Sequence, residues 1–63
     1  MDPHQAKLVA ALKASGLKFY WVAMALGVHR STVQRWSNGH STMPVHQQVA
    51  LRALLIKEGV YGE

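Results

Sequence analysis

The amino-acid sequence predicts an all-α fold, a compact four-helix domain that takes in the whole chain, residues 1–63. Apolar side chains recur every three or four residues in four separate stretches, which is the spacing of one face of a helix. A glycine follows closely after each stretch, where a helix can end. With 63 residues the chain has the length of one small domain. Together these three observations favour a bundle of short helices.

The first helix is predicted over residues 3–15. Asp2 is suited to cap its N-terminus, Pro3 to occupy its first position, and Gln5 to complete a capping box with Asp2. Gly16 is suited to the left-handed position just after the helix. The apolar stripe that should face the core consists of Leu8, Val9 and Leu12.

Two shorter helices are predicted over residues 18–26 and 30–37, separated by a tight turn. Gly27 allows the positive φ that such a turn requires. Asn38 and Gly39 end the second of these helices. The side chains expected to face the core are Val22, Ala23 and Leu26 from one helix and Val33 and Trp36 from the other. Two helices joined in this way form a helix-turn-helix.

The fourth helix is predicted to begin at Pro44 and to reach Glu58, with Gly59 after it. It contains more apolar residues than one buried face requires. Either a domain this small needs nearly all of them in its core, or some stay exposed and form an interface between two copies. That interface would consist of Val49, Ala53 and Ile56. Residues 60–63 are expected to fray unless they dock on the domain.

The distribution of charge points to a polyanion as the partner. The net charge is +4, and the acidic residues are Asp2, Glu58 and Glu63. All seven lysine and arginine residues lie between positions 7 and 57, a stretch that contains no Asp or Glu. Lys and Arg release condensed counterions when they bind phosphates, so such a stretch favours binding to nucleic acid. The alternative is a small basic protein without such a partner.

Other classes of protein are disfavoured by the composition. Without Cys the chain has neither a disulfide nor a thiolate metal site, and its four His residues lack the spacing and the nearby acid that a zinc site uses. We therefore expect no metal, no other cofactor and no small-molecule ligand, and we expect no enzyme. No apolar run approaches the roughly 20 residues of a membrane span. The expected location is the cytoplasm, in association with the nucleoid, without a membrane partner.

The central third of the chain carries a spaced set of apolar residues and glycines, namely Val22, Ala23, Gly27, Val28, Val33, Trp36 and Gly39. In this spacing the segment resembles the helix-turn-helix of the lambda repressor/Cro-like family of small phage and bacterial transcriptional regulators. The resemblance implies that residues 30–37 form a recognition helix in the major groove of double-stranded DNA. It also implies a homodimer on a near-palindromic operator. Repression by occlusion is the expected mechanism.

The expected DNA contacts lie at and near the outer face of this third helix. In the family, the positions that commonly contact base edges match Arg30, Ser31, Gln34 and Arg35. Phosphate contacts are expected from Lys18, Tyr20, Trp21, His29, Thr32 and His40. His29 is also expected to cap the third helix. For Thr32 the alternatives are an inward-facing side chain and a contact with a thymine methyl group.

The start of the second helix departs from the family pattern, in which a Ser or Thr cap followed by Gln is common. Phe19 stands where that glutamine would be, so the glutamine's phosphate contact cannot be carried over. We expect Phe19 to enlarge the core. Tyr20 and Trp21 can instead donate an O–H and an N–H to phosphate, although both could simply pack against the domain.

Two other functions remain compatible with the sequence. The chain could be a DNA-targeting subunit in recombination or transposition. It could also be a protein-interaction module that uses the fourth helix together with Phe19, Tyr20 and Trp21. Steep salt dependence of binding to random duplex DNA would favour the DNA-binding class.

Overall fold

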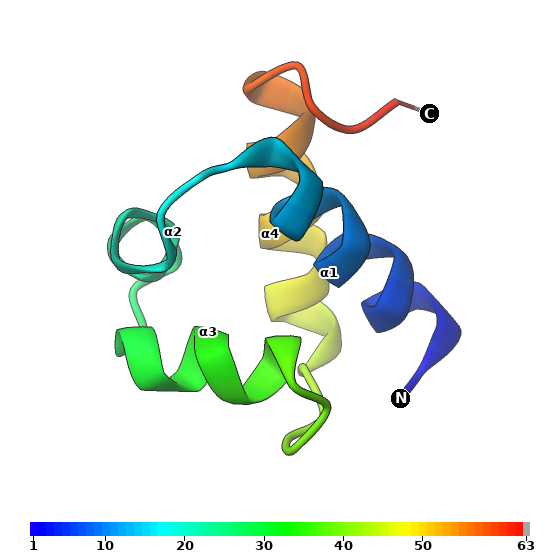
Figure 1. The fold of residues 1–63 in the computed structure, drawn as a ribbon, viewed down its shortest axis with the longest axis vertical. Coiled ribbons are helices and arrows are strands. Elements are labelled where there is room, and N and C mark those ends of the chain that lie inside the picture. Colours follow the sequence, from blue (N-terminus) through cyan, green and yellow to red (C-terminus); the bar gives the residue numbers. More distant parts are fainter. Residues whose placement is uncertain (63) are drawn as a thin grey trace.

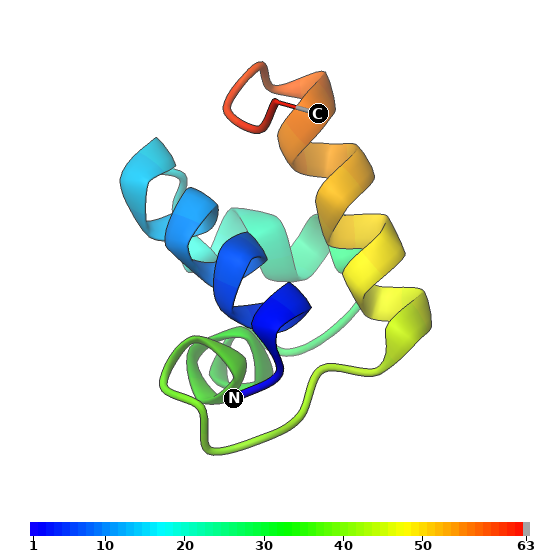
Figure 2. The same ribbon diagram turned by 90° about the vertical axis from the view of Figure 1, so that its right-hand side faces the viewer.

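Four α-helices make up the computed structural model, which describes residues 1–62 (Figure 1). They are α1 (Pro3–Ser15), α2 (Phe19–Leu26), α3 (Arg30–Ser37) and α4 (Val45–Lys57). In Figure 1, α1 lies in front of α4 while α3 crosses below them, and the view in Figure 2 separates α1 on the left from α4 on the right. The predicted all-α, four-helix fold is confirmed.

The helix ends agree closely with the sequence prediction. Asp2 caps α1 by accepting a hydrogen bond of 2.7 Å from the backbone N–H of His4, and Gly16 has the left-handed φ of 76° after its last residue. The bounds of α1 and α3 are those predicted. Lys18 and Pro44 precede α2 and α4 instead of opening them, because both have an extended backbone.

Helices α2 and α3 pack closely together and form the predicted helix-turn-helix. Gly27 has a φ of 72°, and the backbone N–H of Val28 donates to the carbonyl oxygen of Ala23 at 2.9 Å. This left-handed turn redirects the chain after α2, so that α3 crosses it (Figure 1). An L-residue with a side chain would be strained at this φ, which explains the glycine.

The core lies where the four helices meet. α3 packs against α2 and α1, and α4 packs against α1 and α2. Phe19 packs against the core as expected, and Tyr61 does so as well, which docks the segment after α4. Glu63, at the end of that segment, lies outside the described residues. The buried apolar side chains that form this core are Leu8, Leu12, Val22, Ala23, Val33, Trp36, Met43, Leu51 and Leu55.

The expectation that Gln5 completes a capping box with Asp2 is wrong. The Gln5 side chain is 1% exposed and reaches into the domain. Its Nε2 donates to the carbonyl oxygens of Trp36 and Ser41, both at 3.0 Å, and its Oε1 accepts from the backbone N–H of Met43 at 2.9 Å. The amide therefore ties α1 to the end of α3 and to the loop that follows.

Within residues 1–62, no helix combines the length and the apolar character that a membrane crossing requires.

Candidate nucleic-acid interface

Helix α3 lies at the edge of the molecule (Figure 1), and the side chains on its outer face are polar. The opposite face of the helix is apolar and buried, with Val33 and Trp36 exposing no more than 4% of their surface. All four residues predicted to contact bases are exposed, and helical spacing brings them to one strip: Arg30, Ser31, Gln34 and Arg35. We call these four residues the α3 strip.

Both ends of α3 are held, so the α3 strip sits on a rigid support. At the N-terminal end, the Gly27 turn joins the helix to α2. At the C-terminal end, Gln5 binds the carbonyl oxygen of Trp36, and the indole of Trp36 is buried in the core. The Ser37 hydroxyl donates back to the carbonyl oxygen of Val33 at 2.9 Å. A recognition element needs such support, because misplaced side chains lose their base partners.

His29 caps α3, as the sequence predicts. Its Nδ1 accepts a hydrogen bond of 3.1 Å from the backbone N–H of Ser31. The same Nδ1 lies 2.8 Å from the Ser31 hydroxyl oxygen. The imidazole is exposed, so its other nitrogen, Nε2, is open to a partner outside the domain.

The residues predicted to contact phosphate lie at three places in and directly after the helix-turn-helix. Lys18, Tyr20 and Trp21 lie at the start of α2, His29 and Thr32 at the start of α3, and His40 in the turn after α3. All of these residues are exposed apart from Thr32, which is half-buried. This agrees in part with the alternative that the Thr32 side chain faces inward. The two histidines stand at opposite ends of a helix about 12 Å long, at 1.5 Å per residue. Polar and basic groups therefore flank the α3 strip at both ends.

The helix-turn-helix carries basic side chains and no acidic ones. Its basic side chains are Lys18, Arg30 and Arg35, all exposed, and no Asp or Glu occurs between residues 3 and 57. An anion near α3 therefore meets positive side chains and the positive end of the helix dipole without a competing carboxylate on the same two helices.

The outer face of α4 is apolar and exposed, so several apolar residues of this helix lie outside the core. Leu51 and Leu55 are buried, but Val49 and Ile56 are 60% and 40% exposed, and Ala53 between them is exposed too. Val45, which the sequence analysis did not select, extends this face by one turn. We call these four residues the α4 face.

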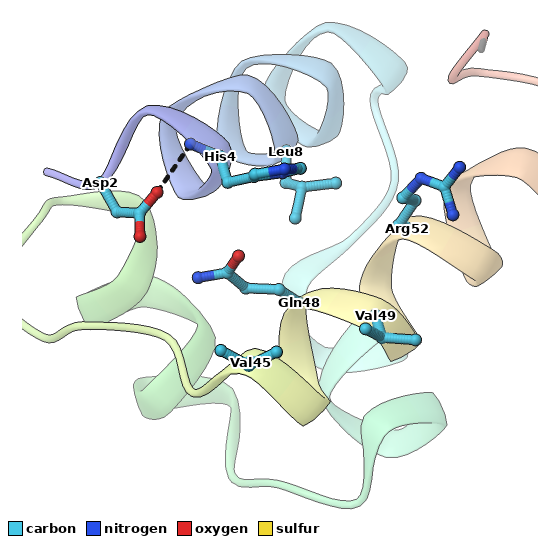
Figure 3. A pocket seen from close by; sticks show the side chains of 7 residues that line it. All are labelled: Asp2, His4, Leu8, Val45, Gln48, Val49 and Arg52. Carbon is cyan, nitrogen blue, oxygen red and sulfur yellow. Dashed lines mark hydrogen bonds between the residues drawn. The ribbon is translucent and has the colours of Figure 1, made fainter.

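A hollow of about 270 Å³ opens beside the α4 face, between α1 and α4 (Figure 3). Leu8, Val45 and Val49 supply its apolar lining. Polar groups at its edge come from both helices: Asp2, His4, Gln48 and Arg52. The hollow thus continues the apolar surface of α4 toward α1.

Sequence reasoning missed two features of the structure, one on the surface and one in the core. Met24 is 74% exposed and stands next to Tyr20 on the outer side of α2, forming an apolar patch with Trp21. Met43 lies in the loop before α4, yet its side chain is buried in the core. Its burial could not be read from the local pattern, because a single apolar residue in a loop has no period.

Among residues 1–62, no three His, Asp or Glu side chains lie close enough together to hold a metal ion.

Comparison of the chain with models of known protein families, with characterised proteins and with solved structures finds no match.

Proposed function

We propose that the chain binds double-stranded DNA in a sequence-specific manner and represses transcription as a dimer on a near-palindromic operator. The observation that carries the proposal is the α3 strip: four exposed side chains with hydrogen-bonding groups on a helix whose opposite face is anchored in the core. An amphipathic helix so held at a molecular edge can enter the major groove as a unit.

The chemistry of the α3 strip supports base recognition. The guanidinium groups of Arg30 and Arg35 match guanine O6 and N7, and the amide of Gln34 matches adenine N6 and N7. A helix with its side chains is about 10–12 Å across and fits the major groove, which is about 12 Å wide, and the eight residues of α3 extend about 12 Å along their axis. The strip thus has both the length and the donors for a few adjacent base pairs.

Groups around the strip support phosphate binding. With Nδ1 engaged in capping α3, the Nε2 of His29 is the ring nitrogen left to donate to phosphate. Lys18 and Tyr20 at the start of α2 and His40 after α3 provide further donors. These contacts would fix the register of α3 on the duplex but would carry no sequence information.

The size of the domain supports a dimer. The longest extent of the molecule is 26 Å. Half-sites read from one side of the duplex are separated by about 34 Å, one helical turn. One copy with one recognition helix therefore reads one half-site. The exposed α4 face offers an apolar surface through which two copies can associate, and the dimer would occlude the DNA it covers.

Selection of bound fragments from a pool of random duplexes tests the proposal. We expect the selected fragments to share two inverted half-sites, with their centres separated by about 10 base pairs. Binding to random duplex should weaken steeply with salt, because each neutralised phosphate releases counterions. A pool that shows no enrichment, together with no retention of any duplex at low salt, would refute DNA binding.

A protein-interaction module is the second candidate, and one observation favours it. Tyr20, Trp21 and Met24 are all exposed and form an apolar patch on α2. Such patches mark binding surfaces on small proteins. The same low-salt experiment separates the candidates, because a module without DNA-binding activity would retain no duplex.

A further inference from the structure

The hydrogen bond between the side chains of His29 and Ser31 has a fixed direction. The Nδ1 of His29 accepts the backbone N–H of Ser31 at 3.1 Å, and this N–H can only donate. Nδ1 therefore carries a lone pair and no hydrogen. The Ser31 hydroxyl oxygen lies 2.8 Å from the same Nδ1. Two lone pairs at that distance would repel each other, so the hydroxyl hydrogen must point from Ser31 to His29.

This direction changes what Ser31 can offer to a base. A serine hydroxyl ordinarily donates one hydrogen bond and accepts others. When its hydrogen is given to His29, the exposed oxygen presents lone pairs alone. In the major groove, lone pairs are matched by the amino groups of adenine N6 and cytosine N4, whereas guanine O6 and thymine O4 are themselves acceptors.

We propose that His29 makes Ser31 an acceptor-only reader, which selects adenine over guanine or cytosine over thymine at one position of the bound sequence. The inference rests on the proposed function, since it assigns a base class to one residue of the α3 strip. His29 acts through Ser31 and is a positioning residue for this contact. The two hydrogen bonds to the Nδ1 of His29 thus have two effects. One caps α3, and the other leaves the Ser31 hydroxyl oxygen able only to accept a hydrogen bond from a base.

The free protein tests the direction of the bond without DNA. Long-range ¹H–¹⁵N spectra of the labelled chain, recorded where the imidazole is neutral, identify which ring nitrogen carries the hydrogen. We expect the hydrogen of His29 on Nε2, and a Ser31→Ala variant should shift the Nδ1 resonance because one of its two donors is lost. A hydrogen on Nδ1 would overturn the inference whatever the protein binds.

Selected duplexes test the readout. Comparing the sequences selected by the wild-type chain and by Ser31→Ala locates the base that Ser31 reads. We expect adenine or cytosine there, and replacing that base by an analogue without the amino group should weaken wild-type binding roughly three- to tenfold, the value of one hydrogen bond. The same replacement should leave the binding of Ser31→Ala unchanged. Guanine or thymine at that position, or no base whose selection depends on Ser31, would overturn the inference.

Two variants of His29 separate positioning from capping. His29→Asn keeps a side-chain acceptor at a preferred capping residue, so the preference for the amino-bearing base should persist. His29→Ala frees the Ser31 hydroxyl to donate. The preference for the amino-bearing base should then fall roughly three- to tenfold, as much as when the hydrogen bond between Ser31 and the base is lost. Thermal unfolding of both variants checks that they fold. If His29→Ala kept the full preference for the amino-bearing base, the positioning role of His29 would be refuted. If neither the wild-type chain nor any variant selected a duplex, the proposed function itself would be refuted.

Discussion

Gln5 and Gln34 carry the same amide group in opposite surroundings. Gln5 is buried, and both its donor and its acceptor functions are used inside the domain. Gln34 is exposed on α3, where no hydrogen bond within the domain occupies its amide among the described residues. One glutamine therefore contributes to stability, and the other is free to contribute to recognition.

Gln34→Ala should reduce discrimination at a single base pair. The amide can bind adenine N6 and N7 together, a contact worth about 1–3 kcal/mol against the wrong base. Competition between the selected duplex and a duplex altered at that pair measures the effect. Binding to random duplex should change little, so an equal loss of affinity for all sequences would contradict base readout by Gln34.

Gln5→Leu should destabilise the domain by about 2–3 kcal/mol, because it leaves a buried backbone N–H and carbonyl oxygens without partners. The free energy of unfolding in urea measures the loss. Gln34→Leu is the matched control, and on an exposed helix face it should change stability by less than about 0.5 kcal/mol. Equal effects of the two substitutions would show that the Gln5 hydrogen bonds do not hold α3 in place.

At the scale of elements, the two helices of the helix-turn-helix begin differently. α3 has a side-chain cap in His29, whereas no side-chain hydrogen bond caps α2. The residue at that position, Lys18, is a poor cap but an exposed cation. A lysine here gives up helix stability and offers a charge at the surface that we propose faces DNA.

Lys18→Ser should therefore have opposite effects on folding and on binding. A serine cap should stabilise the domain by roughly 0.5–1 kcal/mol in urea unfolding. Affinity for all duplexes should fall together, and the slope of log K against log salt should decrease by about one. Lys7→Ser, which removes an exposed charge from α1, serves as the control and should leave the slope unchanged. An unchanged slope in Lys18→Ser would remove Lys18 from the phosphate contacts.

At the scale of the whole molecule, two surfaces serve the proposed function. The α3 strip is polar and basic, whereas the α4 face is apolar. They belong to helices that do not pack against each other, since α3 packs against α1 and α2. One copy can therefore engage DNA through α3 and a second copy through α4 without one surface covering the other.

Ile56→Asp should weaken the dimer, because it places a charge in an apolar interface. Sedimentation should show a monomer at concentrations at which the wild-type chain is dimeric, and affinity for a palindromic site should fall more than affinity for one half-site. Met24→Asp, at an even more exposed apolar position on α2, should leave the free chain dimeric. A wild-type chain that stays monomeric both free and on the palindrome would exclude the dimer.

Much of the fold could be predicted because it depends on neighbours in the chain. The apolar spacing predicted the inner faces of α1, α2 and α3, and Asp2, Gly16 and Gly27 marked helix ends through their own conformational preferences. The exposure of the α3 strip follows from the same period, since residues opposite Val33 and Trp36 must face outward. His29 as the cap of α3 is local as well.

The sequence by itself thus determined the helices, their ends and the polar face of α3, all of which depend on residues within about one helical turn. Tertiary structure alone decided that Gln5 is buried, because its partner Trp36 lies 31 residues away. It also decided that Met43 fills the core and that the α4 face stays outside, since two helices cover only one side of α4. The burial of Gln5 and Met43 depends on packing between segments that are distant in the chain, which the local pattern around each residue does not contain.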